Sequence, residues 1–266
     1  MKKLRKYIKP GLMAIQTAFQ YRFNTLLYMA FSLLPLIAVI YLWQNVYDQK
    51  QIIEGYTIDS MITYLIIAKI LEILLLPAFH WSIQDEVSSG ELSKYLTKPI
   101  SYWGFWFSKN TGNKLVQLML VSIPMGIVAL CIREYFLFPD FHDIAGLIAA
   151  VILAMILYYS LYFLVSLFSF YFVEIASFFF TVDILLELLS GTLFPLKLLP
   201  EPFFHIVKNL PFAYLIDFPA NIYLGRLGVG EILYGLFIQL IWIGILSAFS
   251  KYAWKRAMSK YESVGA

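Results

Sequence analysis

Six stretches of this chain are apolar and long enough to cross a lipid bilayer, and this property constrains the fold more than any other. A helix needs about 20 apolar residues to span about 30 Å of hydrocarbon. With 266 residues in total, six spans leave room for short connections and for no separate soluble domain. We therefore expect one all-α integral membrane domain over residues 1–266 with six transmembrane helices. The expected spans are 24–45, 60–82, 112–132, 144–170, 174–194 and 230–250.

The composition agrees with a membrane protein and disfavours several other classes. The chain is 61% hydrophobic and 14% charged, whereas soluble domains carry about 25% charged residues. The net charge is +3, and the Lys and Arg residues do not form the cluster that nucleic-acid binding needs. No phosphate-binding GxxxxGK[ST] loop or GxGxxG turn is present. The scattered His80, His142 and His205 and the single Cys131 predict no metal site, no disulfide and no catalytic centre.

The distribution of Lys and Arg predicts the orientation in the membrane. Residues 1–22 alternate basic and apolar side chains, which is typical of an amphipathic helix on a membrane surface. Pro10 and the glycine after it are expected to divide that helix into two pieces. Basic residues recur in the 83–114 segment and in the tail from Lys251 to Lys260. Because cytoplasmic segments carry an excess of Lys and Arg, both termini are predicted to be cytoplasmic.

The polar segment between the second and third expected spans is the sharpest local feature. It is expected to form a short amphipathic helix at about 88–97, placed at the cytoplasmic face to dock on a soluble partner. An ordinary solvated loop is the alternative. The residues expected at the docking surface are Ser89, Gly90, Glu91, Leu92, Lys94, Tyr95 and Leu96.

The segment 194–228 differs from the rest of the chain because five prolines cut its apolar runs into pieces too short to span a bilayer. This pattern predicts broken, re-entrant or interfacial helices at one membrane face. With both termini cytoplasmic, that face is external.

Four charged side chains lie away from the ends of the expected spans. A charge costs about 2.5–3.5 kcal/mol at the bilayer centre. Lys69 and Glu72 share one helical face, as do Asp183 and Glu187. Lys69 can pair with Glu72 along its own helix or with either of the other acids across helices. Three interpretations remain open: structural ion pairs, acids that face the translocation route and favour a cationic or polar substrate, and a protonation role.

Short motifs in a fixed order give the chain a resemblance to permease subunits of ABC-2 type ATP-binding-cassette exporters, in the branch of two-permease systems. The resemblance covers essentially the whole chain, and its motifs are individually short. They are SGEL at 89–92, LTKPI at 96–100, LSGTLFPL at 189–196, LPF at 210–212 and YESVGA at 261–266.

The resemblance implies a role for each unusual segment. The N-terminal helix would be an elbow helix, and residues 88–97 would hold a coupling helix. The permease would pair with an ABC ATPase subunit, which binds ATP and Mg, and with a second permease, a paralogue or a second copy. It would lie in a bacterial-type cell membrane. The implied external gate comprises Gly191, Phe194, Pro195, Pro200, Pro211 and Pro219.

The sequence leaves three functions from different classes to consider. The leading one is the permease of an ATP-driven exporter, with ATP hydrolysed in a partner chain and no cofactor in this one. The alternative is an ion-coupled secondary transporter that uses the buried acids Asp183 and Glu187. The absence of an evident sequence repeat argues against it. A membrane enzyme is disfavoured because the histidines are scattered.

Overall fold

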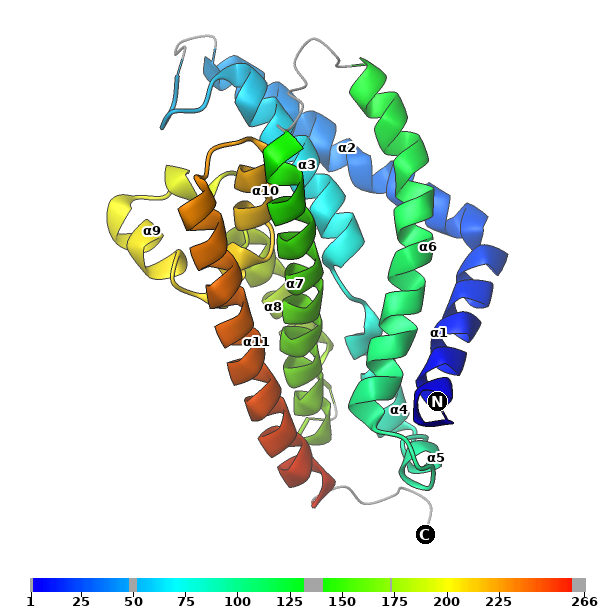
Figure 1. Cartoon of the computed structure of the whole chain (residues 1–266). Helices are drawn as coiled ribbons and strands as arrows, with labels where there is room; N and C mark the ends of the chain where they lie inside the picture. Colours follow the sequence, from blue (N-terminus) through cyan, green and yellow to red (C-terminus); the bar gives the residue numbers. More distant parts are fainter. Residues whose placement is uncertain (1, 48–51, 132–140, 173, 260–266) are drawn as a thin grey trace.

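The computed structural model describes residues 2–47, 52–131, 141–172 and 174–259, and within these ranges every element is helical apart from an isolated β-bridge between Ile53 and Tyr56. In Figure 1, α3, α6, α7 and α11 run roughly along the long axis, while α2 crosses them obliquely. The elements are α1 (Lys2–Gln20), α2 (Arg22–Tyr47), α3 (Ile58–Leu75), α4 (Phe79–Ser88), α5 (Ser93–Leu96), α6 (Tyr102–Cys131), α7 (Phe141–Ser166), η1 (Leu167–Phe170), α8 (Ala176–Leu189), η2 (Leu196–Leu198), α9 (Glu201–Val207), η3 (Pro211–Tyr214), α10 (Asp217–Tyr223) and α11 (Val229–Met258).

The helix α3 forms the centre of the bundle. Every residue from Ser60 to Ala68 is buried, so the helix presents no apolar stripe to one side only. It contacts α2, α6, α7 and α10. A helix that is apolar all round is stable when neighbours or lipid cover every face, and here neighbouring helices do so.

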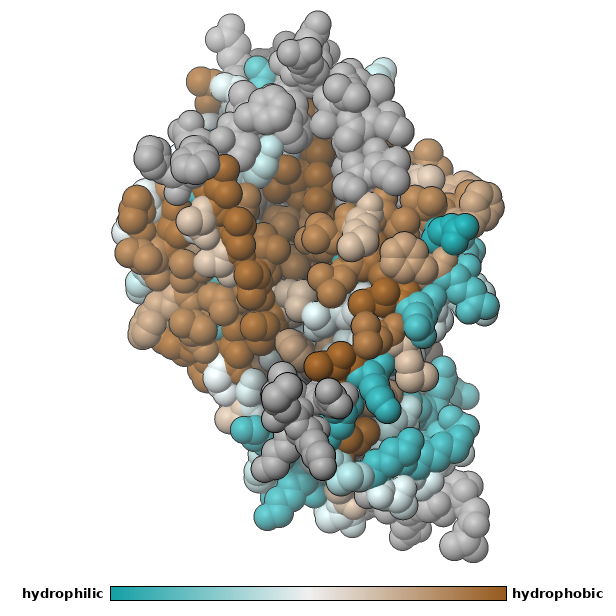
Figure 2. All heavy atoms as spheres, turned by 45° about the vertical axis from the view of Figure 1, so that its right-hand side comes forward, coloured by the Kyte–Doolittle hydropathy of each residue, from teal (hydrophilic) through white to brown (hydrophobic). Residues whose placement is uncertain are grey.

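Helices α2 and α11 carry large apolar side chains on the outside of the bundle. Phe31, Ile37 and Tyr41 of α2 are exposed, as are Leu233 and Phe237 of α11. Figure 2 shows apolar side chains over most of one face and polar ones gathered at one end. An apolar surface of this extent is stable against lipid or another subunit rather than against water.

Three helical segments within the described ranges are long and apolar enough to cross a membrane: Ile58–Ser88, Asp143–Phe170 and Val229–Met258. A shorter apolar helix covers Leu33–Tyr47. The 14-residue α8 extends for about 21 Å at 1.5 Å per residue. It is therefore shorter than the span expected at 174–194.

The apolar segment Ile58–Ser88 covers the span expected at 60–82. Within this segment α3 ends at Leu75, because Pro77 cannot donate a helical hydrogen bond and holds Leu76 extended at ψ 114°. The chain resumes as α4. In contrast, α1 continues through Pro10, where the sequence predicted a break.

Helix α1 packs lengthwise against α6. A Cβ placed on Gly112 would lie 2.4 Å from the Gly11 carbonyl oxygen, so the two backbones meet where both residues lack a side chain. The Lys6 ammonium donates to the Pro99 carbonyl at 2.5 Å, and the Ser101 N–H donates to the Tyr7 hydroxyl at 3.1 Å. These contacts fix α1 beside the start of α6.

The segment 194–228 is divided into the short helices η2, α9, η3 and α10, in keeping with its prolines. The start of α1, the end of α11, α4 and α5 all lie at the other end of the molecule from the α10 region (Figure 1).

Candidate functional site

The residues expected to dock on a partner lie between α4 and α6, in a segment that we call the turn segment (residues 89–100). Helix α4 ends at Ser88, and Gly90 follows with φ +74°. The helix expected over 88–97 is reduced to the single turn α5 because a left-handed residue ends the preceding helix. The chain is then turned back by the Leu92 N–H, which donates to the Glu86 carbonyl at 3.0 Å.

The carboxylate of Glu86 fixes the turn segment from inside. The Tyr95 hydroxyl donates to Glu86 Oε1 at 2.9 Å, and the Tyr102 hydroxyl donates to Glu86 Oε2 at 2.5 Å. Burial, reinforced by the Glu86 charge, raises the pKa of both phenols. Both therefore remain protonated donors at neutral pH, and hydrogen bonds to a charged acceptor are the stronger kind.

Aromatic packing extends this contact to two long helices. The Tyr102 ring stacks on Trp254 of α11, with centroids 5.0 Å apart and planes 18° apart. It also lies 6.4 Å from Phe163 of α7. Leu92 is fully buried beneath the turn. A displacement of the turn segment would therefore change the packing against α7 and α11.

The outer surface of the turn segment is polar and open. Glu91 and Lys94 are 54% and 62% exposed and form an ion pair of 2.5 Å. Ser89 is exposed as well. An exposed pair of this kind contributes little to folding stability, so both side chains are available to a partner. For Leu96 the structure describes the backbone, which ends α5.

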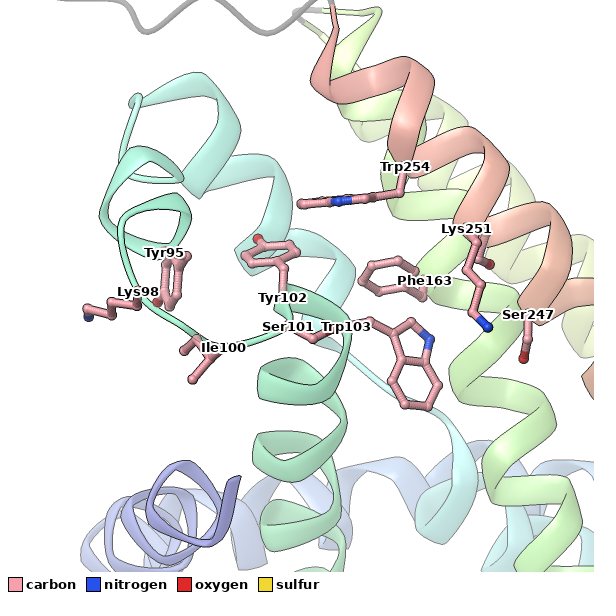
Figure 3. A pocket seen from close by; sticks show the side chains of 11 residues that line it. Tyr95, Lys98, Ile100, Ser101, Tyr102, Trp103, Phe163, Ser247, Lys251 and Trp254 are labelled. Carbon is pink, nitrogen blue, oxygen red and sulfur yellow. The ribbon is translucent and has the colours of Figure 1, made fainter. Parts of the chain in front are cut away.

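A cavity of about 470 Å³ lies between the turn segment, α7 and α11. Figure 3 shows Tyr102, Trp103, Phe163 and Trp254 around it, with Lys251 running along α11 toward Ser247. We call it the aromatic cavity. It was not anticipated from the sequence because its walls come from segments about 150 residues apart in the chain.

The intramembrane charges form two groups. The Lys69 ammonium lies 2.8 Å from Glu72 Oε2 on its own helix, which is one of the pairings left open by the sequence. Glu187 lines a small cavity with both of them. Asp183 lies elsewhere: the Tyr162 hydroxyl donates to its Oδ1 at 2.5 Å, and His80 Nε2 lies 4.0 Å from its Oδ2.

His80 is a site residue that sequence reasoning missed. It is 3% exposed, and neither ring nitrogen has a hydrogen-bond partner among the residues that the structure describes. Its ring packs against Tyr162 and Phe179, with centroids 4.8 Å and 4.9 Å away. No linear spacing signals this group, because α4, α7 and α8 each supply one of the three residues.

Part of the expected external gate gathers around Asp217. The Tyr64 hydroxyl lies 2.7 Å from the Gly191 carbonyl oxygen and 2.8 Å from Asp217 Oδ1. The Leu196 N–H, next to Pro195, donates to the same carboxylate oxygen at 3.0 Å. We call these residues the Asp217 cluster.

The other gate residues occupy different environments. Pro211 and Pro219 are buried, Phe194 is half-buried and Pro200 is exposed at the start of α9. The sequence does carry one signal for the Asp217 cluster: Asp217 is the only acid in a long apolar run.

A second polar group lies beside the Asp217 cluster. The Tyr56 hydroxyl donates to Asn221 Oδ1 at 2.7 Å, and the Arg226 guanidinium lies 3.7 Å from the Tyr56 ring centroid. Arg226 also donates to the Gly55 carbonyl at 2.8 Å. These contacts join the loop before α3 to the end of α10.

Metal binding is not suggested by the described part of the chain, where no three His, Cys, Asp or Glu side chains are grouped to hold an ion. The candidate sites are instead a polar turn supported by aromatic residues, the four charges of α3 and α8, and the Asp217 cluster.

Comparison with known proteins identifies the family. The model of the ABC-2 family transporter proteins matches residues 33–265, nearly the whole length of the chain. No curated protein matches the sequence. The match covers the motifs on which the sequence resemblance rested, apart from the last residue of the motif at 261–266, and it confirms that resemblance. The chain therefore belongs to the ABC-2 family of transporter proteins.

Proposed function

We propose that this multi-pass membrane protein is the permease subunit of an ATP-driven exporter and receives the mechanical signal of ATP hydrolysis through the turn segment. ABC-2 permeases typically lack ATPase activity, so ATP and Mg would be bound by a separate ATPase subunit. In this proposal the six apolar stretches are all transmembrane, with α1 as the elbow helix. The end that carries α5 faces the cytoplasm.

One observation carries the proposal: the turn segment has a polar outer surface and a rigid inner attachment. Glu91 and Lys94 point to the outside, while Glu86 binds the two tyrosines that lie against α6 and α11. A partner that pushed on this surface would displace α7 and α11 through Tyr102 rather than bend a free loop. A ligand changes a conformational equilibrium only through differential binding to the two states, and this surface is where ATPase binding could differ.

The test is co-purification of the chain with its ATPase. We expect the wild-type complex to form, and replacement of residues 88–97 by a Gly/Ser linker to abolish it. The variant Lys94→Glu should weaken the complex, because position 94 would then carry a negative charge beside Glu91. Lys208→Glu, an exposed change in the 194–228 segment, serves as the matched control and should leave the complex intact. A wild-type chain that purifies folded without any bound ATPase, in every nucleotide state, would refute the proposal.

We further propose that Asp183 and Glu187 face the translocation route and favour a cationic or polar substrate. The described residues supply Glu72 as the partner of Lys69, and no cation lies within 4.0 Å of Glu187. The variant Asp183→Asn should change substrate range or transport rate. If only protein yield falls, the acid is structural.

Ion-coupled secondary transport remains the alternative, and the contact of Asp183 with Tyr162 and His80 is the observation in its favour. In vesicles without ATP, a proton gradient alone would then drive transport, and Asp183→Asn would abolish it. ATP-dependent transport that is indifferent to the gradient would exclude this alternative.

The permease is proposed to pair with a second permease, a paralogue or another copy, through part of its exposed apolar surface on α2 and α11. The residues of the expected gate, from Gly191 to Pro219, would then close the route on the external side.

A further inference from the structure

The aromatic cavity has the composition of a ligand site rather than of a packing defect. Its walls include the rings of Tyr102, Trp103, Phe163 and Trp254, which offer apolar faces. Three of these rings are held in place by neighbours: Tyr102 stacks on Trp254, and Trp103 stacks on Phe107 with planes 6° apart. A cavity with fixed walls loses little entropy when a ligand enters.

One hydroxyl in the cavity wall has no hydrogen-bond partner among the described residues. Ser250 is 1% exposed and lines the cavity. Within the described part of the chain its hydroxyl makes no hydrogen bond, not even to the carbonyl four residues earlier. Leaving a buried hydroxyl unpaired costs about 1–3 kcal/mol. Rotation about its Cα–Cβ bond among staggered positions would let the hydroxyl donate to a ligand oxygen.

The charge at the cavity is positive. Lys251 lines it beside Ser250, and no acid lies within salt-bridge distance of Lys251 in the described part of the chain. The carboxylate of Glu86 is bound by the hydroxyls of two residues that line the cavity, Tyr95 and Tyr102. Among the described residues, a ligand in the cavity would therefore meet an ammonium and a hydroxyl donor, and no carboxylate lines the walls.

The cavity also lies where a phospholipid headgroup would be found. It adjoins the last third of the apolar helix Val229–Met258 at the polar end of the bundle. Tryptophan and tyrosine gather at the membrane–water interface, and Lys residues near it attract anionic lipids by about 1 kcal/mol each.

We propose that the aromatic cavity binds the phosphate-bearing headgroup of an anionic phospholipid. Lys251 and Ser250 would contact the phosphate, and the aromatic rings would surround the glycerol and the first part of the acyl chains. The lipid site itself does not depend on the orientation given under the proposed function. That orientation decides only that this end of the bundle lies in the inner leaflet. Because Tyr102 forms one wall and also binds Glu86, the bound lipid would contact the side chain that holds the turn segment.

The test uses the full-length, detergent-purified and delipidated chain, with phosphatidylglycerol retention measured by native mass spectrometry. We expect one tightly retained lipid and about fivefold weaker retention in Lys251→Ala, which corresponds to one basic contact. Ser250→Ala should also weaken retention. Lys255→Ala is the matched control: it removes the same charge one turn further along α11, outside the cavity, and should leave retention unchanged.

The source of the phosphate is distinguished by competition. Phosphatidylglycerol that is retained against a large excess of inorganic phosphate supports the lipid assignment. Displacement by inorganic phosphate, with the same dependence on Lys251, would overturn it in favour of a soluble phosphate. Equal losses in Lys251→Ala and Lys255→Ala would overturn the site altogether, because the attraction would then belong to the whole basic surface. None of these measurements requires ATPase or transport, so their outcome is independent of the proposed function.

Discussion

At the scale of single residues, Gly191 is fixed by two independent constraints. Its φ of +87° is strained for any residue with a Cβ, and a Cβ there would lie 2.6 Å from the Tyr64 hydroxyl oxygen. We expect Gly191→Ala to destabilise the protein by roughly 1–3 kcal/mol or more, measured as a lower thermal melting temperature in detergent. Gly244→Ala is the control, since a Cβ there meets nothing within 4 Å. Equal melting temperatures for the two variants would contradict the packing seen around Asp217.

Asp217 should make stability depend on pH. Burial raises the pKa of Asp217 from 3.8 to about 6, so the folded state holds its proton more tightly than the unfolded chain. The resulting stabilisation is complete below about pH 4 and is lost as pH rises through 6, a change of about 3 kcal/mol at most. Asp217→Asn keeps an acceptor for Tyr64 and cannot titrate. The melting temperature of wild type relative to this variant should therefore fall between pH 4 and 7, and a constant difference would refute the prediction.

At the scale of elements, the prolines show what sequence can and cannot establish. For the majority of helix ends, the limits expected from the apolar runs agree with the structure within a few residues, because hydrophobic length is a local property. The effect of a proline is not local. Pro77 ends α3, while Pro10 and Pro35 lie inside continuous helices. The α1–α6 packing at Gly11 and Gly112 illustrates the non-local contacts that a single sequence does not reveal.

The end of α3 before Pro77 is contacted by a residue at the expected cytoplasmic end of the span 112–132. The Lys114 ammonium is buried and donates to the carbonyl oxygens of Ile73 and Leu76, at 3.3 Å and 2.6 Å, which the end of α3 leaves unpaired. Lys114→Met should destabilise the protein by about 2–4 kcal/mol, since buried acceptors lose a charged donor. Lys197→Met, at an exposed position, should leave the melting temperature unchanged. If both variants melted alike, Lys114 would not hold this helix end.

The support of the turn segment is testable separately from its outer surface. Tyr102→Phe keeps the stack on Trp254 and removes the 2.5 Å hydrogen bond to Glu86. We expect ATPase binding to persist and ATP-driven transport to fall about tenfold, since a hydrogen bond to a charged group contributes about 1.5–3 kcal/mol. Tyr252→Phe, on the exposed side of α11, is the control and should transport normally. Unchanged transport in Tyr102→Phe would show that the signal does not pass through Glu86.

At the scale of the whole molecule, the sequence located the unusual segments but not the contacts among them. Charge counting and hydrophobic length identified the two ends of the bundle and the proline-rich segment. The aromatic cavity and the His80–Asp183 contact depend on the convergence of α4, α7, α8 and α11, which no periodicity encodes. The Asp217 cluster was not predicted either, although Asp217 is a single acid in an apolar run, and its partner Tyr64 comes from a distant helix.

The proposed orientation of the bundle rests on the same charge asymmetry and can be measured directly. In a Cys131→Ser background, which removes the single cysteine, new cysteines replace exposed lysines at opposite ends: Lys208→Cys after α9 and Lys94→Cys in the turn segment. A membrane-impermeant maleimide added to intact cells should label the first and should label the second only after the membrane is opened. Because Lys and Arg are retained on the cytoplasmic side during insertion, the reverse pattern would require the basic termini to have crossed the bilayer. It would also move the turn segment away from any cytoplasmic ATPase, so this labelling decides whether the proposed coupling surface is accessible to its partner.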